Sequence, residues 1–277
     1  MINELFNKEI SIAVHRGKSG GSIIENTYAS AQCAILSGAD IVEFDVTRTL
    51  DNNIVLFHTN MEKRLFSTIF PVGLLPLNIL KKRALHGAYG RNSGFKLDDY
   101  EEYLNKMKDK CILNLDRIWC ADINKCLAVI DKLQMFNQII FKSDLGHCKK
   151  IFKALSKYKD KNITFMAICK SKEDLDKIEA IAKEFEIEIR IIEAIFYKES
   201  DYLCSEEFLK RAKNNNQLTW VNAIDLHKKA NMCALHGDNT SITDSFDRGW
   251  GWLIEKGFNI IQTDWPALLS KYTKNKI

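Results

Sequence analysis

Short runs of β-branched and other apolar residues alternate along the chain with longer segments in which apolar residues recur every three or four positions. The first pattern is typical of buried β-strands and the second of amphipathic helices. The short runs predict eight strands, at residues 11–15, 40–46, 111–115, 138–142, 162–168, 187–192, 217–222 and 258–262. Helices are predicted between and after them, at residues 25–37, 97–106, 122–134, 145–157, 172–184, 205–213, 241–256 and 265–272.

Eight strand-helix repeats within about 250 residues predict an α/β fold of the TIM type, a single (β/α)8 barrel. An open doubly wound sheet is the alternative, but it usually has fewer strands. Residues 59–96 interrupt the alternation after the second strand, and they hold two of the three prolines. We interpret this stretch as an insertion that caps the barrel mouth. One domain over residues 1–277 is therefore expected.

Composition narrows the class of protein. A hydrophobic fraction of 46% with 27% charged residues is ordinary for a soluble globular enzyme. The net charge of +4 is too small and too dispersed to indicate nucleic-acid binding. The first residues lack the features of a secretory signal, and no apolar run reaches the roughly 18 to 20 residues of a transmembrane helix. Eight scattered cysteines without a CxxC pair favour reduced thiols over disulfides or a zinc site, so we expect a cytoplasmic protein.

Acidic residues gather where the second and third predicted strands end. Glu43 and Asp45 are two positions apart in a strand, so their side chains point to the same face. Inside a barrel, two bare carboxylates would repel each other and need a cation. Together with Asp116 at the end of the third strand they predict a metal site of oxygen ligands, which suits Mg²⁺ or Ca²⁺. The alternative is an ion-pair network with Arg16 or Lys142.

Two histidines are expected beside these acids. His15 follows the first strand, and a turn at residues 51–53 with a short hairpin-like extension would return His58 to the same site. Two such histidines can share proton transfer, one as base and one as acid. Arg16 has the planar fork that matches phosphate oxygens, and Glu25 is placed to hold it. Asn26 and Thr27 follow Glu25, and helix capping is the preferred interpretation of both. A structural role is expected for the other four histidines, namely His86, His147, His227 and His236.

At this point the residues resemble the glycerophosphodiester phosphodiesterase family, within the phosphatidylinositol-phospholipase-C-like phosphodiesterases. The resemblance is strongest over residues 11–58, in the segments His15-Arg16-Gly17, Glu25-Asn26-Thr27, Gly38-Ala39-Asp40, Glu43-Phe44-Asp45-Val46 and His58. Residues 257–266 and 220–222 resemble the family's last strand and its seventh-strand motif. The resemblance implies that His15 and His58 are the acid and base, Glu43 and Asp45 metal ligands, and Arg16 a phosphate clamp.

The third strand departs from the family's pattern. The family usually has glutamate there, followed two residues later by lysine, whereas this chain has Asp116 and Ile118. Lys142 at the end of the fourth strand is a candidate for the missing charge. The aspartate also resembles related phospholipase D toxins that cyclise choline phospholipids. Three more polar or aromatic residues at strand ends are candidates for substrate binding, alongside Glu25 and Lys142: Glu193, Trp220 and Asn222.

We therefore expect a metal-dependent phosphodiester hydrolase that cleaves a small-molecule or lipid-derived phosphodiester, such as a glycerophosphodiester, to glycerol phosphate and an alcohol. The attacking group is either a neighbouring hydroxyl of the substrate, which gives a cyclic phosphate, or water. A lipid- or polymer-directed phosphodiesterase is the first alternative, in which apolar residues of the insertion grip a long substrate: Phe66, Ile69, Phe70, Val72, Leu74, Leu75 and Leu77. Packing of these residues on the barrel is the simpler interpretation. A noncatalytic phosphodiester-binding barrel is the second alternative.

Overall fold

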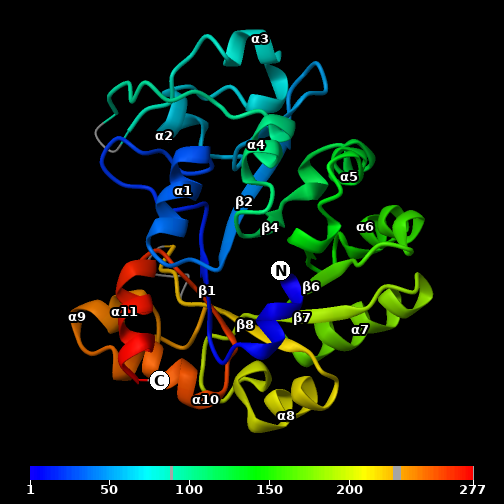
Figure 1. The fold of residues 1–277 in the computed structure, drawn as a ribbon, viewed down its shortest axis with the longest axis vertical. Coiled ribbons are helices and arrows are strands. Elements are labelled where there is room, and N and C mark those ends of the chain that lie inside the picture. The colour runs from blue at the N-terminus through cyan, green and yellow to red at the C-terminus, as the bar shows by residue number, and fades with distance from the viewer. Residues whose placement is uncertain (88–89, 227–231, 277) are drawn as a thin grey trace.

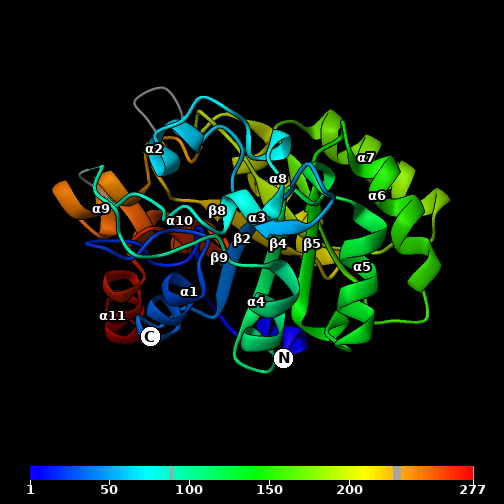
Figure 2. The ribbon, with the colours of Figure 1, turned by 90° about the horizontal axis from the view of Figure 1, so that it is seen from above.

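The computed structural model describes residues 1–87, 90–226 and 232–276. Within these residues, eight parallel strands close into a barrel that helices surround (Figures 1 and 2). The strand order is β1-β9-β8-β7-β6-β5-β4-β2, and pairing of β1 with β2 closes the ring. A further short strand, β3, pairs antiparallel with β2 outside the ring. The predicted α/β TIM barrel is confirmed.

The barrel strands are β1 (Ser11–Val14), β2 (Ile41–Arg48), β4 (Ile112–Asp116), β5 (Ile139–Ser143), β6 (Thr164–Cys169), β7 (Ile189–Ala194), β8 (Leu218–Asn222) and β9 (Ile260–Thr263), and β3 is Ile54–Leu56. The helices around and between them are α1 (Tyr28–Leu36), α4 (Tyr100–Met107), α5 (Ile123–Lys132), α6 (Cys148–Leu155), α7 (Lys172–Glu184), α8 (Glu206–Asn214), α9 (Asp238–Thr243), α10 (Trp252–Lys256) and α11 (Pro266–Lys276). No described helix is long and apolar enough to cross a membrane.

The inward face of the strands changes from apolar to polar along the barrel axis. At the amino ends the interior is filled by residues such as Ile41, Ile112, Ile140 and Ile191, and the N-terminal 3-10 helix (Ile2–Asn7) packs against this layer. The N-terminus accordingly lies at the end of the barrel away from α2 (Glu62–Phe66), as Figure 2 shows. Two residues further along six of these strands the inward side chain is polar: Glu43, Asn114, Lys142, Glu193, Asn222 and Gln262. The period of two thus gathers polar groups at the carboxyl end.

The outward face of the strands packs under the helices. Residues such as Phe44, Leu115 and Phe141 alternate with the inward set and belong to one large buried cluster, which includes the inner faces of α4 to α8. Leu175 and Ile178 of α7 are fully buried in this cluster, as the one-sided apolar spacing of that helix predicts. Burial of both strand faces is the physical reason why the strands are near-continuous apolar runs.

The insertion after β3 contains two short helices, α2 (Glu62–Phe66) and α3 (Leu77–Leu80), and a 3-10 turn (Val72–Leu74). Figure 1 shows α2 and α3 beyond α1 and β2. Phe66 and Val72 are buried in a small apolar cluster of their own with Phe57 and Leu80, so packing is confirmed for part of the insertion. Leu75 and Leu77 pack partly against the same cluster. Three further apolar side chains of the set are exposed, namely Ile69 at 83%, Phe70 at 61% and Leu74 at 60%.

Two helical segments differ from the sequence prediction. The first helix begins at Tyr28, and Thr27 caps it by accepting a hydrogen bond from the Ser30 backbone. Asn26 was also expected to cap, which is wrong, because its side chain bonds to Asp45 instead. The helix predicted at 241–256 is broken into α9, a π-helical turn (Asp247–Gly251) and α10. A side chain at Gly249 would clash with Ser241, which lies against that turn.

Candidate active site

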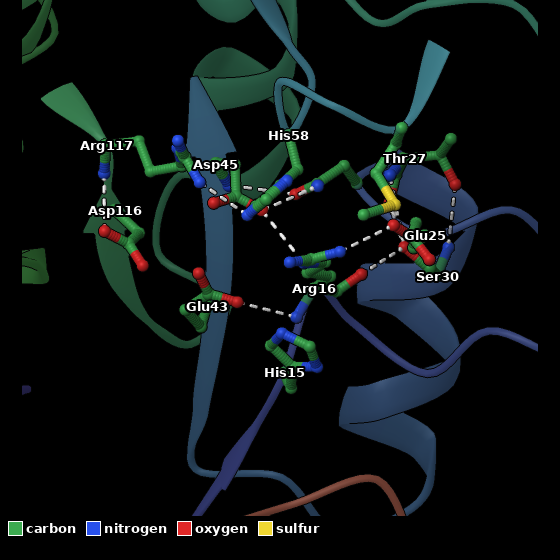
Figure 3. A network of polar contacts seen from close by, with 12 residues as sticks. His15, Arg16, Glu25, Thr27, Ser30, Glu43, Asp45, His58, Asp116 and Arg117 are labelled. Atoms are coloured by element: carbon green, nitrogen blue, oxygen red, sulfur yellow. Dashed lines mark hydrogen bonds and ion pairs between the residues drawn. The ribbon is translucent and has the colours of Figure 1, made fainter. Parts of the chain in front are cut away.

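The turn after β1 fixes the first two residues of the site. Arg16 and Gly17 have positive φ angles of 53° and 70°. A Cβ atom on Gly17 would lie only 2.6 Å from Ser30 Oγ and 2.7 Å from the Ser30 carbonyl carbon. Only glycine fits this turn against the start of α1. The close approach directs His15 and Arg16 toward the barrel mouth, where Figure 3 shows them beside the acids of β2.

Three carboxylates from neighbouring strands meet at the mouth of the barrel and form a carboxylate cluster. Glu43 and Asp45 project inward from β2, and Asp45 pairs in register with Asp116 of β4. Glu43, Asp45 and Asp116 each offer one oxygen that lies within 4.8 Å of the other two. Glu43 and Asp45 are each 1% exposed. The shared inward face predicted from their spacing is therefore confirmed.

Two basic side chains border the carboxylate cluster. Arg16 Nε lies 3.1 Å from Asp45 Oδ2, and Lys142 Nζ lies 2.9 Å from Asp116 Oδ2. The ion-pair network considered as the alternative to metal ligation therefore exists in part. It leaves Glu43 out, because no basic side chain in the described part of the chain lies within salt-bridge distance of this carboxylate. Glu43 Oε2 accepts a hydrogen bond from the Arg16 backbone at 2.8 Å.

The electrostatics of the carboxylate cluster fit a divalent cation. Burial, together with the charge of Asp45, raises the pKa of Glu43 to about 8, because adjacent buried carboxylates disfavour the ionised form. Burial also acts on Asp116, but Lys142 outweighs it and holds the pKa of that carboxyl below its ordinary value. Three oxygen donors at this spacing are a ligand set suited to a hard cation. Glu43, Asp45 and Asp116 can therefore hold a metal ion.

His15 is arranged to carry a proton. Its Nδ1 atom lies 3.4 Å from Asp264 Oδ1, in the turn after β9. Burial of the ring opposes protonation, but the hydrogen bond with Asp264 and the charge of Glu43 outweigh it and raise the pKa of His15 above its ordinary value. A histidine with a raised pKa that faces the carboxylates is suited to donate a proton.

The pKa of His58 shifts in the opposite direction to that of His15. It follows β3, whose antiparallel pairing with β2 brings the chain back to the barrel mouth as the sequence predicts. Burial lowers the pKa of His58, and the charges of Arg16 and Arg117 add to this effect, while Asp45 opposes it. Arg117 Nη1 donates a hydrogen bond to His58 Nε2 at 2.6 Å. A neutral histidine beside the carboxylate cluster is suited to accept a proton.

Glu25 links the barrel to the insertion. Its Oε1 atom accepts a hydrogen bond from Arg16 Nη1 at 2.9 Å, and its Oε2 atom forms a short ion pair with Arg64 of α2. These two arginines hold the pKa of Glu25 below its ordinary value against the effect of burial. Asn26 forms two hydrogen bonds with Asp45: its Nδ2 donates to Asp45 Oδ2, and its Oδ1 accepts from the Asp45 backbone N–H. The segment before α1 therefore fixes both Arg16 and Asp45, and the predicted contact of Glu25 with Arg16 is confirmed.

The remaining candidates form a buried polar row across β5, β7 and β8. Lys142 Nζ lies 3.5 Å from Glu193 Oε2, and Glu193 Oε1 accepts a hydrogen bond from Asn222 Nδ2 at 2.7 Å. Trp220 is fully buried, and its indole N–H donates to Asn222 Oδ1 at 2.9 Å. As the side chain lies, Trp220 supports Asn222 from inside the barrel and has no exposed surface for a substrate. Glu193 lies within β7 rather than after it.

Two charged residues of this region were missed by the sequence analysis. Arg117 belongs to no recognisable motif, and it contacts His58 from a left-handed backbone, with a φ angle of 56°. Asp238 at the start of α9 is 2% exposed and accepts hydrogen bonds from Trp250 Nε1, Thr263 Oγ1 and the Asp264 backbone N–H. Burial raises its pKa to about 7. Asp238 therefore positions the turn that presents Asp264 to His15.

The other described histidines have structural partners. His86 Nδ1 bonds to Ser67, His147 bonds to Asp144 and stacks on Trp119, and His236 bonds to Glu199 and stacks on Trp252. These contacts agree with the structural role expected for them. His227 lies outside the described residues.

Several solved structures share the fold of this chain. The chain is similar to a glycerophosphoryl diester phosphodiesterase from Parabacteroides distasonis, with a TM-score of 0.74 and 18% identity over 100% of this chain and 92% of that chain. It is also similar to a glycerophosphodiester phosphodiesterase from Thermotoga maritima, with a TM-score of 0.62 and 20% identity over 95% and 98%. A third similar structure is an Oleispira antarctica phosphodiesterase in complex with the product sn-glycerol-3-phosphate. Its TM-score is 0.65, with 15% identity over 95% of this chain and 96% of that chain.

Comparisons of sequence are less specific. A family model described as DUF4996, a domain of unknown function, matches residues 165–273. No curated protein matches the chain. The structural likeness, at these identities, is a likeness of fold. The chain thus has the α/β TIM barrel seen in solved glycerophosphodiester phosphodiesterases.

Proposed function

We propose that this protein is a metal-dependent phosphodiester hydrolase of the glycerophosphodiester phosphodiesterase family, which cleaves a glycerophosphodiester to glycerol phosphate and an alcohol. One observation carries the proposal: a buried carboxylate cluster of Glu43, Asp45 and Asp116 is flanked by two histidines whose pKa values shift in opposite directions. The likeness to the solved phosphodiesterases supports it.

The roles of the side chains follow from their charges. His58, whose lowered pKa favours the neutral ring, accepts a proton from the attacking hydroxyl of the substrate or from water. His15, whose raised pKa favours the protonated ring, donates one to the leaving oxygen. Arg16, fixed by Glu25 and Asp45, offers positive charge to the phosphate. A Mg²⁺ or Ca²⁺ ion at the carboxylate cluster would supply Lewis-acid stabilisation of the phosphate oxygens.

A panel of soluble phosphodiesters tests the proposal, with glycerophosphocholine as the first member. Turnover is measured with added Mg²⁺ or Ca²⁺, with chelator, and for His15→Ala. We expect hydrolysis that needs both the metal and His15. Turnover that persists in chelator and in His15→Ala contradicts the mechanism, and metal-dependent phosphate binding without turnover of any diester points to the noncatalytic barrel.

A second candidate is hydrolysis of a lipid phosphodiester, and one observation favours it. Ile69, Phe70 and Leu74 of the insertion are exposed at 83%, 61% and 60%, although neighbouring apolar side chains of the same segment pack inward. The insertion is tied to the site through Arg64 and Glu25. Exposed apolar residues grouped on such a segment suit contact with acyl chains.

A further inference from the structure

The basic groups around the carboxylate cluster differ in how they are paired. Arg16 contacts two carboxylates, Glu25 at 2.9 Å and Asp45 at 3.1 Å. Lys142 also contacts two, at 2.9 Å and 3.5 Å. Arg117 stands apart, because among the described residues its guanidinium has no carboxylate within salt-bridge distance. Its side-chain partner is the uncharged ring of His58, and its Nε atom is buried without a hydrogen bond.

The contact with His58 occupies the atom that a base must use. Arginine can only donate, so His58 Nε2 is the acceptor in the 2.6 Å hydrogen bond from Arg117 Nη1. The other ring nitrogen, Nδ1, is buried in the protein. His58 can therefore accept a proton at the site only when Arg117 withdraws from Nε2. An arginine whose resting partner is a neutral ring, and whose Nε atom has no hydrogen-bond partner, can exchange that ring for an anion, which offers charge on both sides of the bond.

The backbone places Arg117 where a phosphate would arrive. It follows Asp116 at the carboxyl end of β4, with a φ angle of 56°, just as Arg16 follows His15 after β1 with a φ angle of 53°. The two arginines thus approach the carboxylate cluster from different strands, and Figure 3 shows them on different sides of Asp45.

We propose that Arg117 is a second phosphate-binding residue, which moves its guanidinium from His58 Nε2 to a non-bridging oxygen of the bound phosphodiester and so releases the base when substrate is present. The inference rests on the proposed function. It predicts that substrate binding and activation of His58 are one event, because His58 Nε2 is freed when Arg117 Nη1 turns to the phosphate.

Binding of sn-glycerol 3-phosphate and of inorganic phosphate, measured by calorimetry with Mg²⁺ and again with chelator, tests this inference without relying on turnover. Arg117→Asn is the main variant, because asparagine tolerates a positive φ angle. Arg117→Lys keeps the charge without the planar fork. Arg48→Asn is the matched control, since it removes one exposed positive charge from the end of β2. Thermal unfolding of each variant checks that it is folded.

We expect Arg117→Asn to weaken phosphate binding at least about tenfold, the effect of losing a charged hydrogen bond, Arg117→Lys to weaken it less, and Arg48→Asn to bind like the wild type. Arg117→Asn that binds as tightly as the wild type overturns the inference and leaves Arg117 as a support for His58. An equal loss in Arg48→Asn overturns it as well. If Arg117→Asn does not fold, Arg117→Lys with wild-type affinity is the overturning result. A wild type that binds phosphate through Arg117 but cleaves no diester refutes the proposed function and keeps the inference.

Discussion

Lys142 on β5 reaches across to β4, where its Nζ atom lies 2.9 Å from Asp116 Oδ2. Burial opposes the positive charge of Lys142, but Asp116 and Glu193 outweigh it and raise its pKa above the ordinary value, so the amine stays charged. A buried amine whose charged form is favoured thus lies beside the carboxylate cluster. In the glycerophosphodiester phosphodiesterases that this chain resembles, a lysine is usual two residues after the acid of the third strand. This chain has Ile118 there, which is fully buried.

Lys142→Met tests whether that amine acts on the substrate. We expect turnover to fall more than about tenfold, because a positive charge that stabilises the transition state is lost. The exposed Lys150 of α6 provides a control, since Lys150→Met removes the same charge far from the cluster. Steady-state kinetics and thermal unfolding of both variants are compared. An unchanged rate for folded Lys142→Met would remove Lys142 from the chemistry.

The two histidines predict the form of the pH profile. The pKa of His58 is lowered and that of His15 is raised, so between these two values His58 is neutral and His15 is protonated. The rate should fall on the acid side as His58 gains a proton, and on the alkaline side as His15 loses one.

Asp264→Asn should move only one limb of that profile. The variant removes the carboxylate that favours protonated His15, so the alkaline limb of kcat/KM should shift to lower pH while the acid limb stays in place. The measurement is the pH dependence of kcat/KM at saturating metal. A shift of the acid limb instead would exchange the roles that we assign to the two histidines.

Glu43→Gln should separate stability from function. The folded-state pKa of Glu43 is about 8, against an ordinary 4.5. In the metal-free protein, stability from this group is therefore greatest at low pH and is lost as the pH rises from about 4.5 to about 8. Glutamine removes the charge, so at neutral pH the metal-free variant should be more stable than the wild type, on the order of 1 kcal/mol, and metal should no longer stabilise it.

Thermal unfolding with and without Mg²⁺ or Ca²⁺ from pH 5 to about 8.5 measures both effects. Wild-type stabilisation by metal should grow over this interval, because the ion displaces a proton from Glu43 more easily at higher pH. A metal response that is independent of pH, or one that survives in Glu43→Gln, would argue against Glu43 as a ligand.

The exposed residues of the insertion predict a selective effect on lipid substrates. Ile69→Ser with Phe70→Ser removes apolar surface that is exposed at 83% and 61%. Turnover of a lysolipid phosphodiester, or binding to phosphatidylcholine vesicles, should fall by about tenfold, whereas turnover of glycerophosphocholine should be unchanged. Phe66→Ser is unsuitable as a control, because that side chain is buried. If the double variant and the wild type turn over the lipid substrate at equal rates, the exposed residues of the insertion have no role in binding it.

The sequence predicts the barrel and the carboxylate pair because both depend on local periodicity. A period of two puts Glu43 and Asp45 on one face of β2, and eight apolar runs in alternation with helices suffice for a closed parallel sheet. The hairpin that returns His58 is also local, since a turn at residues 51–53 separates β2 from the short strand β3. These features need no knowledge of distant contacts.

The rest of the site depends on contacts that sequence patterns do not encode. Asn26 has the residue type and place of a helix cap, but a buried carboxylate nearby outcompetes the helix end for its amide. Arg117 contacts His58 from a left-handed backbone that no sequence pattern predicts. Asp238 acts on Asp264 from 26 positions away in the chain. In each case a tertiary hydrogen bond, rather than a propensity, decides the geometry.

Anomalous diffraction from a crystal of this protein soaked in Mn²⁺ and sn-glycerol 3-phosphate tests the central claim most directly. We predict a metal peak within coordination distance of Glu43, Asp45 and Asp116, with the phosphate at that ion and within reach of the two histidines. A peak bound by other residues, or a phosphate held away from His15 and His58, would contradict the proposed site.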